Sequence, residues 1–599
     1  MNILKNLHKM ISYQENLDRE GFILKETKDD KEAGPDKSGR PANPDNSGKS
    51  GDPDNGGKPP DKDRPQSKRI CFKKPRRPSE MHKSEPSLKQ DSVSSSLDQN
   101  MEAINRLYGL PKNKDIVLRD FYLGTSPSLK GMAVFIDGLT DKTLQDLLFQ
   151  ALMLFADRPA PDDRGKLAEL VKEALLPGNQ VKVIDGLKDV LSAVNTGDTV
   201  LFLEGCARAV LVETKGWEHR GVERPVAEQI ILGPQEAFTE TLRANTALLR
   251  KIIKNENLTT EFVVVGERSQ TNVAFMYLRD LANPDLVKEV KRRIKSIKTD
   301  YVLDSGVIEQ FIEDNPYSLN PTILATERPD RVASKVAEGR VAIIVDGSPF
   351  VLVVPTSMYE QLHTGEELYN RWQYGSFIRW LRALAFLLSF LLPGFYLAVV
   401  LYHQEMIPTE LLLAIAGNRE RVPFPSIVEV LLMEFSFELI REAGLRIPGV
   451  MGSTIGIVGA LILGQAAVQA NIVSPILVIL VAVTGLASFA IPYYSLAFTM
   501  RIYRFFYIFL GTTLGFFGIS MGLLAQVIVT ANLKSFGSPY LAPAGPKTSD
   551  WADVVTVAPV FFHEKRPDYI NPQETTRQPK VSRGWIKKNA DEKAGDKND

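Results

Sequence analysis

The pattern of hydrophobic and charged positions divides the chain into three stretches. Between Lys25 and Arg69 the only apolar residues besides Gly and Pro are Ala33 and Ala42. From about residue 96 to 364, short apolar runs alternate with amphipathic segments, which is typical of strands and helices that share a core. Long uncharged runs follow. The pattern predicts a multi-domain protein that combines α/β domains with an α-helical membrane domain.

We expect residues 1–95 to form a disordered leader rich in Pro, Gly, Asp and Lys. So few apolar side chains cannot offset the entropy of ordering a backbone. A nine-residue near-repeat, PDNSGKSGD from Pro44 and PDNGGKPPD from Pro53, marks low complexity. A solvated tether is the favoured interpretation, and a docking tail that uses the basic residues from Lys68 to Arg77 is the alternative.

The second stretch repeats itself. GMAVFIDGLTDKTLQDLLFQAL from Gly131 resembles NVAFMYLRDLANPDLVKEVKRRI from Asn272, each an apolar strand, a turn and a helix. GDTVLFLEGCARAVLVET from Gly197 matches GRVAIIVDGSPFVLVVPT from Gly339, each two strands around a Glu-Gly or Asp-Gly turn. Because both matches have nearly the same offset, we expect tandem duplicated α/β subdomains with the same strand order.

We place the first soluble α/β subdomain at residues 96–235. The second occupies residues 236–370 together with a linking helix, whose start is expected just before this range, at Pro234. Asp141 and Asn283 precede equivalent helices in the two copies, and their side-chain oxygens are expected to cap those helices.

Residues 371–534 are expected to form a bundle of four to five transmembrane helices. Ala383–Tyr402 is an uncharged run of twenty residues, enough at about 1.5 Å per residue to cross a hydrocarbon core of roughly 30 Å. Between Arg446 and Arg501, 54 consecutive residues carry no charge, which suffices for two crossings that turn near Asn471. A last run, Phe505–Leu533, supplies a further span.

Small residues recur at packing intervals in these spans. Glycines spaced three or four residues apart form a stripe along which another helix can approach closely. The candidate packing residues are Gly452, Gly456, Gly459, Gly511, Gly515, Gly518 and Gly522. The alternative is the generally high glycine content of membrane helices, with no packing role.

One amphipathic helix, Pro423–Gly444, differs from the other spans because it is acidic. Glu434, Glu438 and Glu442 recur every four residues and share one face. Ionised carboxylates at the centre of a bilayer cost several kcal/mol each. This face is therefore expected either to lie in the membrane interface or to face water inside the bundle.

Four polar residues are candidates for a pore or ion path: Glu434, Glu438, Gln465 and Gln469. Each pair lies one turn apart on its helix. If several subunits form a ring, the glutamines would line a wet constriction and the glutamates an acidic vestibule that concentrates cations. The alternatives are an interfacial helix and glutamines that only bridge helices.

Flanking charges predict the orientation. Arg371, Arg379 and Arg382 precede the first span, whereas His403–Glu410 contains no Lys or Arg. This asymmetry places the N-terminal domain on the cytoplasmic side. If the acidic helix does not cross, four spans return residues 535–599 to that side as a C-terminal cytoplasmic tail. A fifth crossing would place the tail outside.

Composition and motif content exclude several classes of function. The 72 Lys and Arg residues balance 72 Asp and Glu residues, so no global field attracts nucleic acid. Cys71 and Cys206 cannot form a disulfide framework or a four-thiolate zinc site. The six histidines lack metal-binding spacing, and no nucleotide-binding motif occurs. We expect no enzyme activity, no cofactor, no metal site and no nucleic-acid partner.

Several segments together resemble the A subunit of GerA-type spore germinant receptors. They cover about Asp115 to Pro543 and occur in this order: GPQEAFTETLRANTALLRKIIK, TERPDRVASKVAEGRVAIIVDGSPFVLVVP, PFPSIVEVLLMEFSFELIREAGLRIP, STIGIVGALILGQAAVQANIVSP and SFGSPYLAP. The chain departs from the family pattern at Gln235, where Arg is common, and at Leu319-Asn320, where Phe is usual before Pro-Thr.

This resemblance implies an integral protein of the spore inner membrane with its N-terminal domain on the core side. It implies a transporter-like B subunit and a lipoprotein C subunit as partners. It also implies a homo-oligomer, a ring that conducts monovalent cations when nutrient binds and so triggers germination. The alternatives are a non-conducting receptor scaffold and a secondary transporter component, although a transporter is expected to show repeats in its membrane part.

Overall fold

The computed structural model describes residues 92–123, 125–126, 128–154, 158–159, 167–175, 181–216, 224–225, 227–446, 462–548, 554 and 556–579. Of the leader expected at residues 1–95, residues 1–91 lie outside these described ranges. Its last four residues belong to the first subdomain, since Ser92 bridges to Gly186 and Val93 is buried.

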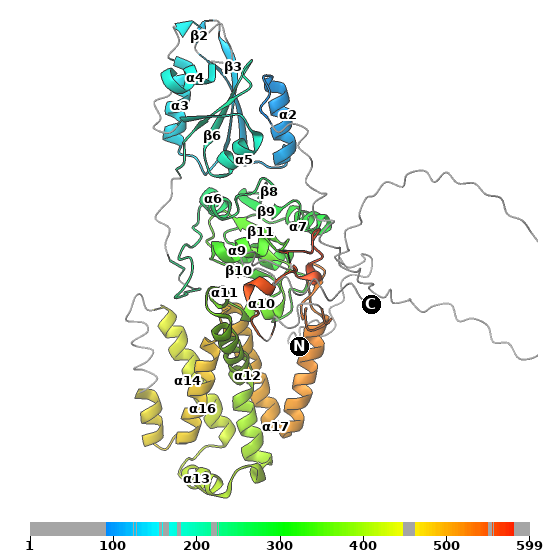
Figure 1. Ribbon diagram of the computed structural model, residues 1–599. Coiled ribbons are helices and arrows are strands. Elements are labelled where there is room, and N and C mark those ends of the chain that lie inside the picture. Colours follow the sequence, from blue (N-terminus) through cyan, green and yellow to red (C-terminus); the bar gives the residue numbers. More distant parts are fainter. Residues whose placement is uncertain are drawn as a thin grey trace, which may run out of the picture. The chain divides into compact units, whose positions relative to one another are not determined.

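Subdomain 1 is built on a five-stranded sheet with the order β1-β3-β6-β7-β5 (Figure 1). All its pairings are antiparallel. β2 and β4 form a separate, parallel two-stranded sheet. The elements are α2 (Leu97–Tyr108), β1 (Ile116–Leu123), β2 (Thr125–Ser126), β3 (Leu129–Ile136), α3 (Lys142–Leu154), β4 (Arg158–Pro159), α4 (Leu167–Leu170), the π-helix η3 (Val171–Leu175), β5 (Val181–Ile184), α5 (Leu187–Asn195), β6 (Thr199–Leu203) and β7 (Ala209–Val212).

Helices cover both faces of this sheet, and its central strands are apolar and buried over residues 131–136 of β3 and 200–203 of β6. Met132 and Val134 of β3 pack with α2 and α5 on one face. Ala133 and Phe135 pack with α3 and α4 on the other. Successive side chains of a strand point to opposite faces, and helices on both faces therefore require a continuous apolar run.

Subdomain 2 has a second five-stranded sheet, with the order β10-β12-β11-β9-β8. All its pairings are antiparallel as well. The elements are α6 (Leu242–Ile252), β8 (Leu258–Val265), β9 (Thr271–Leu278), α7 (Pro284–Lys295), α8 (Ser305–Ile312), β10 (Leu324–Thr326), α9 (Pro329–Val336), β11 (Val341–Val345), β12 (Val351–Val354), α10 (Met358–Leu362) and α11 (Glu366–Tyr369).

The two sheets have equivalent topology, as the sequence repeats predict. Read from β8, the second sheet runs β8-β9-β11-β12-β10, which matches the first sheet strand for strand. The predicted caps are also present. Asp141 Oδ1 accepts from the backbone nitrogen of Thr143 at 2.7 Å, and Asn283 Oδ1 accepts from that of Asp285 at 2.9 Å.

The linking helix begins later than expected, at Leu242 rather than Pro234. The Asn245 side chain accepts from the backbone nitrogen of Thr239 at 2.8 Å and donates to the carbonyl of Thr239 at 2.6 Å. These bonds hold the preceding backbone in a non-helical form, since a side-chain amide that satisfies backbone groups competes with the helix.

The membrane domain contains both long and short helices (Figure 1). They are α12 (Trp372–Tyr402), the 3-10 turn η4 (Gln404–Met406), α13 (Thr409–Arg419), α14 (Ser426–Arg446), a helix at 462–469, α16 (Pro475–Phe489) and α17 (Tyr494–Asn532). Among the described residues, α12 and α17 alone combine the length and hydropathy of a membrane span. The bundle of four to five spans is therefore not confirmed, because α14 is charged, α16 has 15 residues and the segment 447–461 lies outside the described part.

Helix α17 is not the single straight span that the run Phe505–Leu533 suggested. Gly515 has φ 60° and ψ −142°, which breaks the helix. The Tyr507 hydroxyl donates to Gln526 Oε1 at 2.6 Å, although 19 residues of straight helix would separate them by about 28 Å. The chain therefore reverses at Gly515, and two helical arms pack side by side.

The segment after α17 packs on subdomain 2 rather than forming a separate tail. It contains β13 (Lys534–Ser535), β14 (Ser538–Pro539) and the 3-10 turns η5 (Val560–Phe562) and η6 (Asp568–Ile570). The Gln573 side chain donates to the carbonyls of Arg279 and Ala282 at 2.9 and 2.6 Å. Arg566 donates to the Ala337 carbonyl at 3.1 Å.

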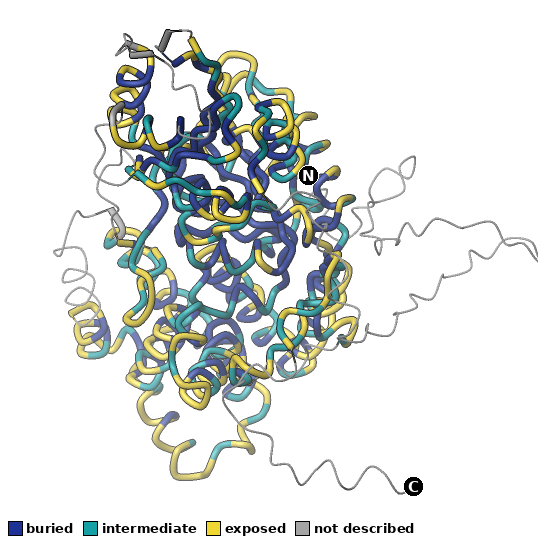
Figure 2. The backbone as a smooth tube through the Cα atoms, turned by 45° about the horizontal axis from the view of Figure 1, so that its top comes forward, coloured by how far each residue is buried: buried dark blue, intermediate teal, exposed yellow. Residues whose placement is uncertain are grey.

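Burial differs between the parts (Figure 2). The central strands of both sheets are buried along most of their length, whereas the membrane helices carry many exposed apolar side chains. Phe435 and Leu439 of α14, for example, are 58% and 71% exposed. Such side chains suit a surface that lipid or another helix covers.

Candidate functional site

The central feature of the membrane domain is a buried ion pair between two helices. Glu434 of α14 and Arg504 of α17 have no exposed side-chain surface, and Arg504 Nη1 lies 2.6 Å from Glu434 Oε2. Arg504 Nε also donates to the carbonyl oxygen of Ser389 in α12, at 2.8 Å. One guanidinium thus joins three helices, α12, α14 and α17.

A second carboxylate extends this pair into a network. Glu438 lies one turn after Glu434, and its side chain is 25% exposed. Arg441 Nη1 and Arg501 Nη1 approach its oxygens at 3.3 and 3.5 Å, and Arg504 Nη1 approaches at 3.8 Å. We call these five residues, Glu434, Glu438, Arg441, Arg501 and Arg504, the ionic network.

The ionic network carries more positive than negative charge. It holds three guanidinium groups and two carboxylates, so its acidic face is not a bare cation-attracting surface within one chain. Glu434 Oε1 and Arg504 Nη2 are buried without a hydrogen-bond partner among the described residues. An unpartnered buried polar atom costs free energy, which favours water or a rearranged contact at this position.

The sequence pattern explains how each helix places its charges. The i, i+4 spacing of Glu434 and Glu438 puts both on one face of α14. Arg501 and Arg504 are three residues apart in α17 and share a face in the same way. Sequence reasoning treated these arginines as the flanks of two spans. The signal that could have identified them was a pair of arginines at helical spacing opposite a pair of acids.

Another acidic residue of α14 stabilises a turn. Glu429 is 3% exposed, and its Oε2 accepts from the backbone nitrogen of Ser474 at 3.1 Å. Ser474 precedes the first residue of α16. A carboxylate at a helix N-terminus satisfies a free backbone donor and interacts favourably with the helix dipole.

The two candidate glutamines do not join the ionic network. Gln465 and Gln469 are exposed on the helix at 462–469, whereas Ala467 packs in a core cluster with Val430 and Met433 of α14. Two residues along a helix correspond to about 200° of rotation. The glutamines therefore lie on the face away from α14, where a neighbouring molecule or water can reach them.

The glycines of α17, Gly511, Gly515, Gly518 and Gly522, lie at close helix contacts. They do not face a single neighbouring helix, as a straight stripe would. A Cβ on Gly511 would lie 2.3 Å from the carbonyl oxygen of Gly394 in α12. A Cβ on Gly518 would meet the carbonyl oxygen of Leu510 at 2.5 Å, and one on Gly522 would meet the Leu510 side chain at 2.6 Å. Gly511 thus faces α12, and Gly518 and Gly522 face the opposite arm of α17.

The first glycine group, Gly452, Gly456 and Gly459, lies outside the described residues. In the part of the chain that the structure describes, no cluster of three or more His, Cys, Asp or Glu side chains could hold a metal ion.

The sequence matches, over residues 102–569, the family described as Bacillus/Clostridium GerA spore germination protein. Spore germination protein KA of Bacillus subtilis (strain 168) is 38% identical over 515 residues, which cover 84% of this chain and 93% of that protein. Spore germination protein GerLA of Bacillus cereus is 38% identical over 481 residues, which cover 80% and 96%.

Among solved structures, the chain is similar to the N-terminal domain of the A subunit of the Bacillus megaterium spore germinant receptor GerK3. The two are 36% identical, the TM-score is 0.35, and the match covers 44% of this chain and 95% of that domain.

Proposed function

Because the chain belongs to the GerA spore germination protein family, we propose that it is the A subunit of a nutrient-responsive germinant receptor in the spore inner membrane. In this proposal several copies assemble into a gated channel for monovalent cations. A transporter-like B subunit senses the nutrient, and a lipoprotein C subunit completes the receptor. The soluble subdomains lie on the core side.

The observation that carries the channel proposal is the ionic network within the membrane domain. Charged side chains inside membrane helices are costly and commonly mark ion paths. Glu438 is partly exposed, and Gln465 and Gln469 are exposed on the face of their helix away from α14, so these three line one path only if a neighbouring copy brings its glutamines to the Glu438 side. Glu434 holds the arginines in place behind it.

The C-terminal segment supports the proposed orientation. Ser535 and Gln573 form hydrogen bonds with subdomain 2, and a chain that leaves and returns to one side must cross the membrane an even number of times. Four crossings satisfy this requirement when the two arms of α17 are counted separately.

A non-conducting scaffold is the rival function, and one observation favours it. Glu434 is fully buried and paired with Arg504, which is the geometry of a structural link between helices. In that case the A subunit would relay nutrient binding without forming a path for ions. A secondary transporter component has no comparable support from the described residues.

Substitution of Glu438 distinguishes the channel from the scaffold. Glu438→Gln removes a partly exposed charge, whereas replacement of Glu434 would leave Arg504 buried without a counter-ion and would test folding instead. In spores that carry this chain as their A subunit, we expect nutrient-triggered K⁺ release to slow several-fold. Glu410→Gln, at an exposed position of α13, is the control. Unchanged release by correctly assembled Glu438→Gln protein would favour the scaffold.

A further inference from the structure

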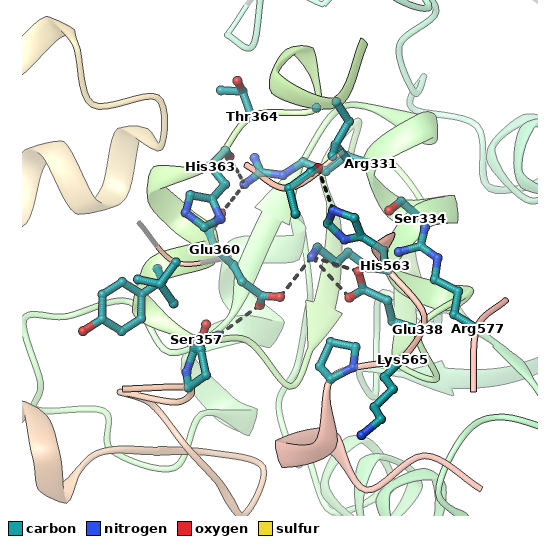
Figure 3. A pocket seen from close by; sticks show the side chains of 18 of the residues that line it. Arg331, Ser334, Glu338, Ser357, Glu360, His363, Thr364, His563, Lys565 and Arg577 are labelled. Atoms are coloured by element: carbon teal, nitrogen blue, oxygen red, sulfur yellow. Dashed lines mark hydrogen bonds and ion pairs between the residues drawn. The ribbon is translucent and has the colours of Figure 1, made fainter. Parts of the chain in front are cut away.

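A cavity of about 430 Å³ lies between subdomain 2, the first turns of α12 and the C-terminal segment (Figure 3). Its lining includes Arg331 of α9, Glu360 of α10, Arg379 of α12 and Tyr569 of η6. The volume falls within the range of about 300–1,000 Å³ that small-molecule sites occupy. Three separate parts of the chain build these walls, so the cavity exists only when the C-terminal segment is docked.

The buried charges of the cavity already have partners within the chain. The ion pairs are Lys335–Glu360 at 2.9 Å, Lys335–Glu338 at 3.2 Å, Arg328–Asp330 at 2.8 Å, Arg331–Glu228 at 3.2 Å and Arg379–Glu367 at 2.8 Å. A molecule that enters therefore meets a nearly neutral floor.

The unpaired charges lie on the wall that the C-terminal segment supplies. Among the described residues, the side chains of Glu564, Lys565 and Arg577 form no hydrogen bond or ion pair. Two of them are cations and one is a carboxylate, so this wall carries a net positive charge. Lys565 and Arg577 are exposed, which places them at the mouth. In Figure 3 the Arg577 side chain lies beside Ser334.

Neutral groups complete the lining. The Thr364 hydroxyl is buried and has no hydrogen-bond partner among the described residues, so it can bond to a ligand. The rings of Tyr359 and Phe562 offer apolar surface. Burial, together with the nearby charges of Arg379 and Lys335, lowers the pKa of His363 well below its usual range, so this imidazole is uncharged at neutral pH.

We propose that this cavity binds a small organic carboxylate. The carboxylate pairs with the Arg577 guanidinium, and the Lys565 ammonium adds positive charge at the mouth. A polar group at the far end of the ligand bonds to the Thr364 hydroxyl, and the body of the ligand packs on Tyr359 and Phe562. A guanidinium matches a carboxylate in charge and geometry. The ligand bridges the C-terminal segment and subdomain 2, so its binding stabilises the docked arrangement.

Three probes of similar size test the charge of the ligand: benzoate, benzylamine and benzyl alcohol. Isothermal titration calorimetry measures the binding of each probe to the full-length protein in nanodiscs whose lipids carry no net charge. We expect saturable benzoate binding at least about tenfold tighter than that of the other two, because hydrogen bonds between charged groups are the stronger ones. Absent benzoate binding, or equal affinity for benzylamine, would overturn the proposal without affecting the proposed channel.

Variants then locate the site. Lys565→Gln with Arg577→Gln should weaken benzoate binding at least about tenfold. Arg268→Gln with Lys295→Gln removes the same charge from exposed positions of subdomain 2 outside the cavity and should leave the affinity unchanged. Thr364→Val, which preserves side-chain size and charge, should leave benzoate affinity unchanged, because benzoate has no second polar group to reach Thr364. Equal affinity in the wild type and the Lys565/Arg577 variant would refute this location.

Discussion

At the scale of single residues, Arg250 joins the two soluble subdomains. Its side chain is 2% exposed, and Nη2 donates to Asp115 Oδ1 at 2.7 Å and to the Leu258 carbonyl at 2.9 Å. Asp115 immediately precedes the first strand of subdomain 1, whereas Arg250 belongs to α6. One buried ion pair thus sets the contact between the two copies.

Arg250→Met should destabilise the protein by about 3–5 kcal/mol, because it leaves the Asp115 carboxylate buried without a partner. The double variant Arg250→Met with Asp115→Asn should recover part of this loss. Thermal unfolding of the full-length protein in detergent measures both effects. Additive losses in the double variant would show that the pair does not couple the subdomains.

Two glutamates of subdomain 2 predict a pH dependence. Burial raises the pKa of Glu309 to about 7, with a contribution from Asp304, and burial raises that of Glu313 to about 8, with contributions from Glu309 and Asp314. Both groups bind protons more tightly in the folded state. Their contribution to stability is therefore complete below the pKa of the unfolded chain and is lost as the pH rises through about 7–8.

Glu309→Gln with Glu313→Gln should consequently raise the melting temperature at pH 9, by about 1–2 °C. The amides imitate the protonated acids, so the variant and the wild type should converge near pH 5. Melting curves of the two proteins across this pH range provide the measurement. A difference that stays constant with pH would show that ionisation of these groups is not its cause.

At the scale of secondary-structure elements, the reversal of α17 depends on one glycine. Gly515 has φ 60° and ψ −142°, a conformation that is essentially restricted to glycine. A Cβ there would also lie 3.1 Å from the Tyr402 ring. The reversal places Gly518 and Gly522 against the preceding arm.

Gly515→Ala should reduce the yield of folded protein and lower its stability by about 1–3 kcal/mol, because alanine is strained in this conformation. Gly417→Ala is the matched control, since a Cβ on Gly417 would meet no atom within 4 Å and alanine favours helix. Size-exclusion chromatography and thermal unfolding in detergent compare the two. Equal behaviour would mean that the chain tolerates a straight α17.

The sequence predicted elements well where local signals agree. The duplicated sheets follow from apolar strands and turn residues at a constant offset, and Asp141 and Asn283 cap their helices as expected. The reversal at Gly515 was missed because a glycine at packing spacing looks the same whether it packs a helix or ends one. The roles of Arg501 and Arg504 depend on tertiary pairing with α14, so their helical spacing becomes informative only when it is matched with the spacing of the acids in a distant part of the sequence.

At the scale of the whole molecule, direct hydrogen bonds connect subdomain 2 to the membrane domain. The Tyr493 hydroxyl, just before α17, accepts from the Ala325 nitrogen at 3.1 Å and donates to the Ile323 carbonyl at 3.2 Å. The Thr499 hydroxyl of α17 donates to the Leu319 carbonyl at 2.6 Å. These bonds attach subdomain 2 directly to the helix that carries Arg501 and Arg504.

The beginning of α12 and the C-terminal segment add two further connections. Arg379 and Arg382 of α12 pair with Glu367 of α11, and the Tyr540 hydroxyl donates to the Gln361 side chain at 3.2 Å. The charge pattern around Arg379 predicted only membrane orientation. Its ion pair with subdomain 2 makes the same residue part of the link between the soluble and membrane domains.

The central claim is that assembled copies of this chain conduct monovalent cations. Single-channel recording of the complete receptor, purified with all its subunits and reconstituted in a planar lipid bilayer with a KCl gradient and the nutrient, tests it most directly. The account predicts discrete openings whose reversal potential lies on the cation-selective side, and a weaker selectivity for Glu438→Gln under the same conditions. A correctly assembled oligomer that receives every subunit of the receptor and its nutrient, yet passes no current, would contradict it.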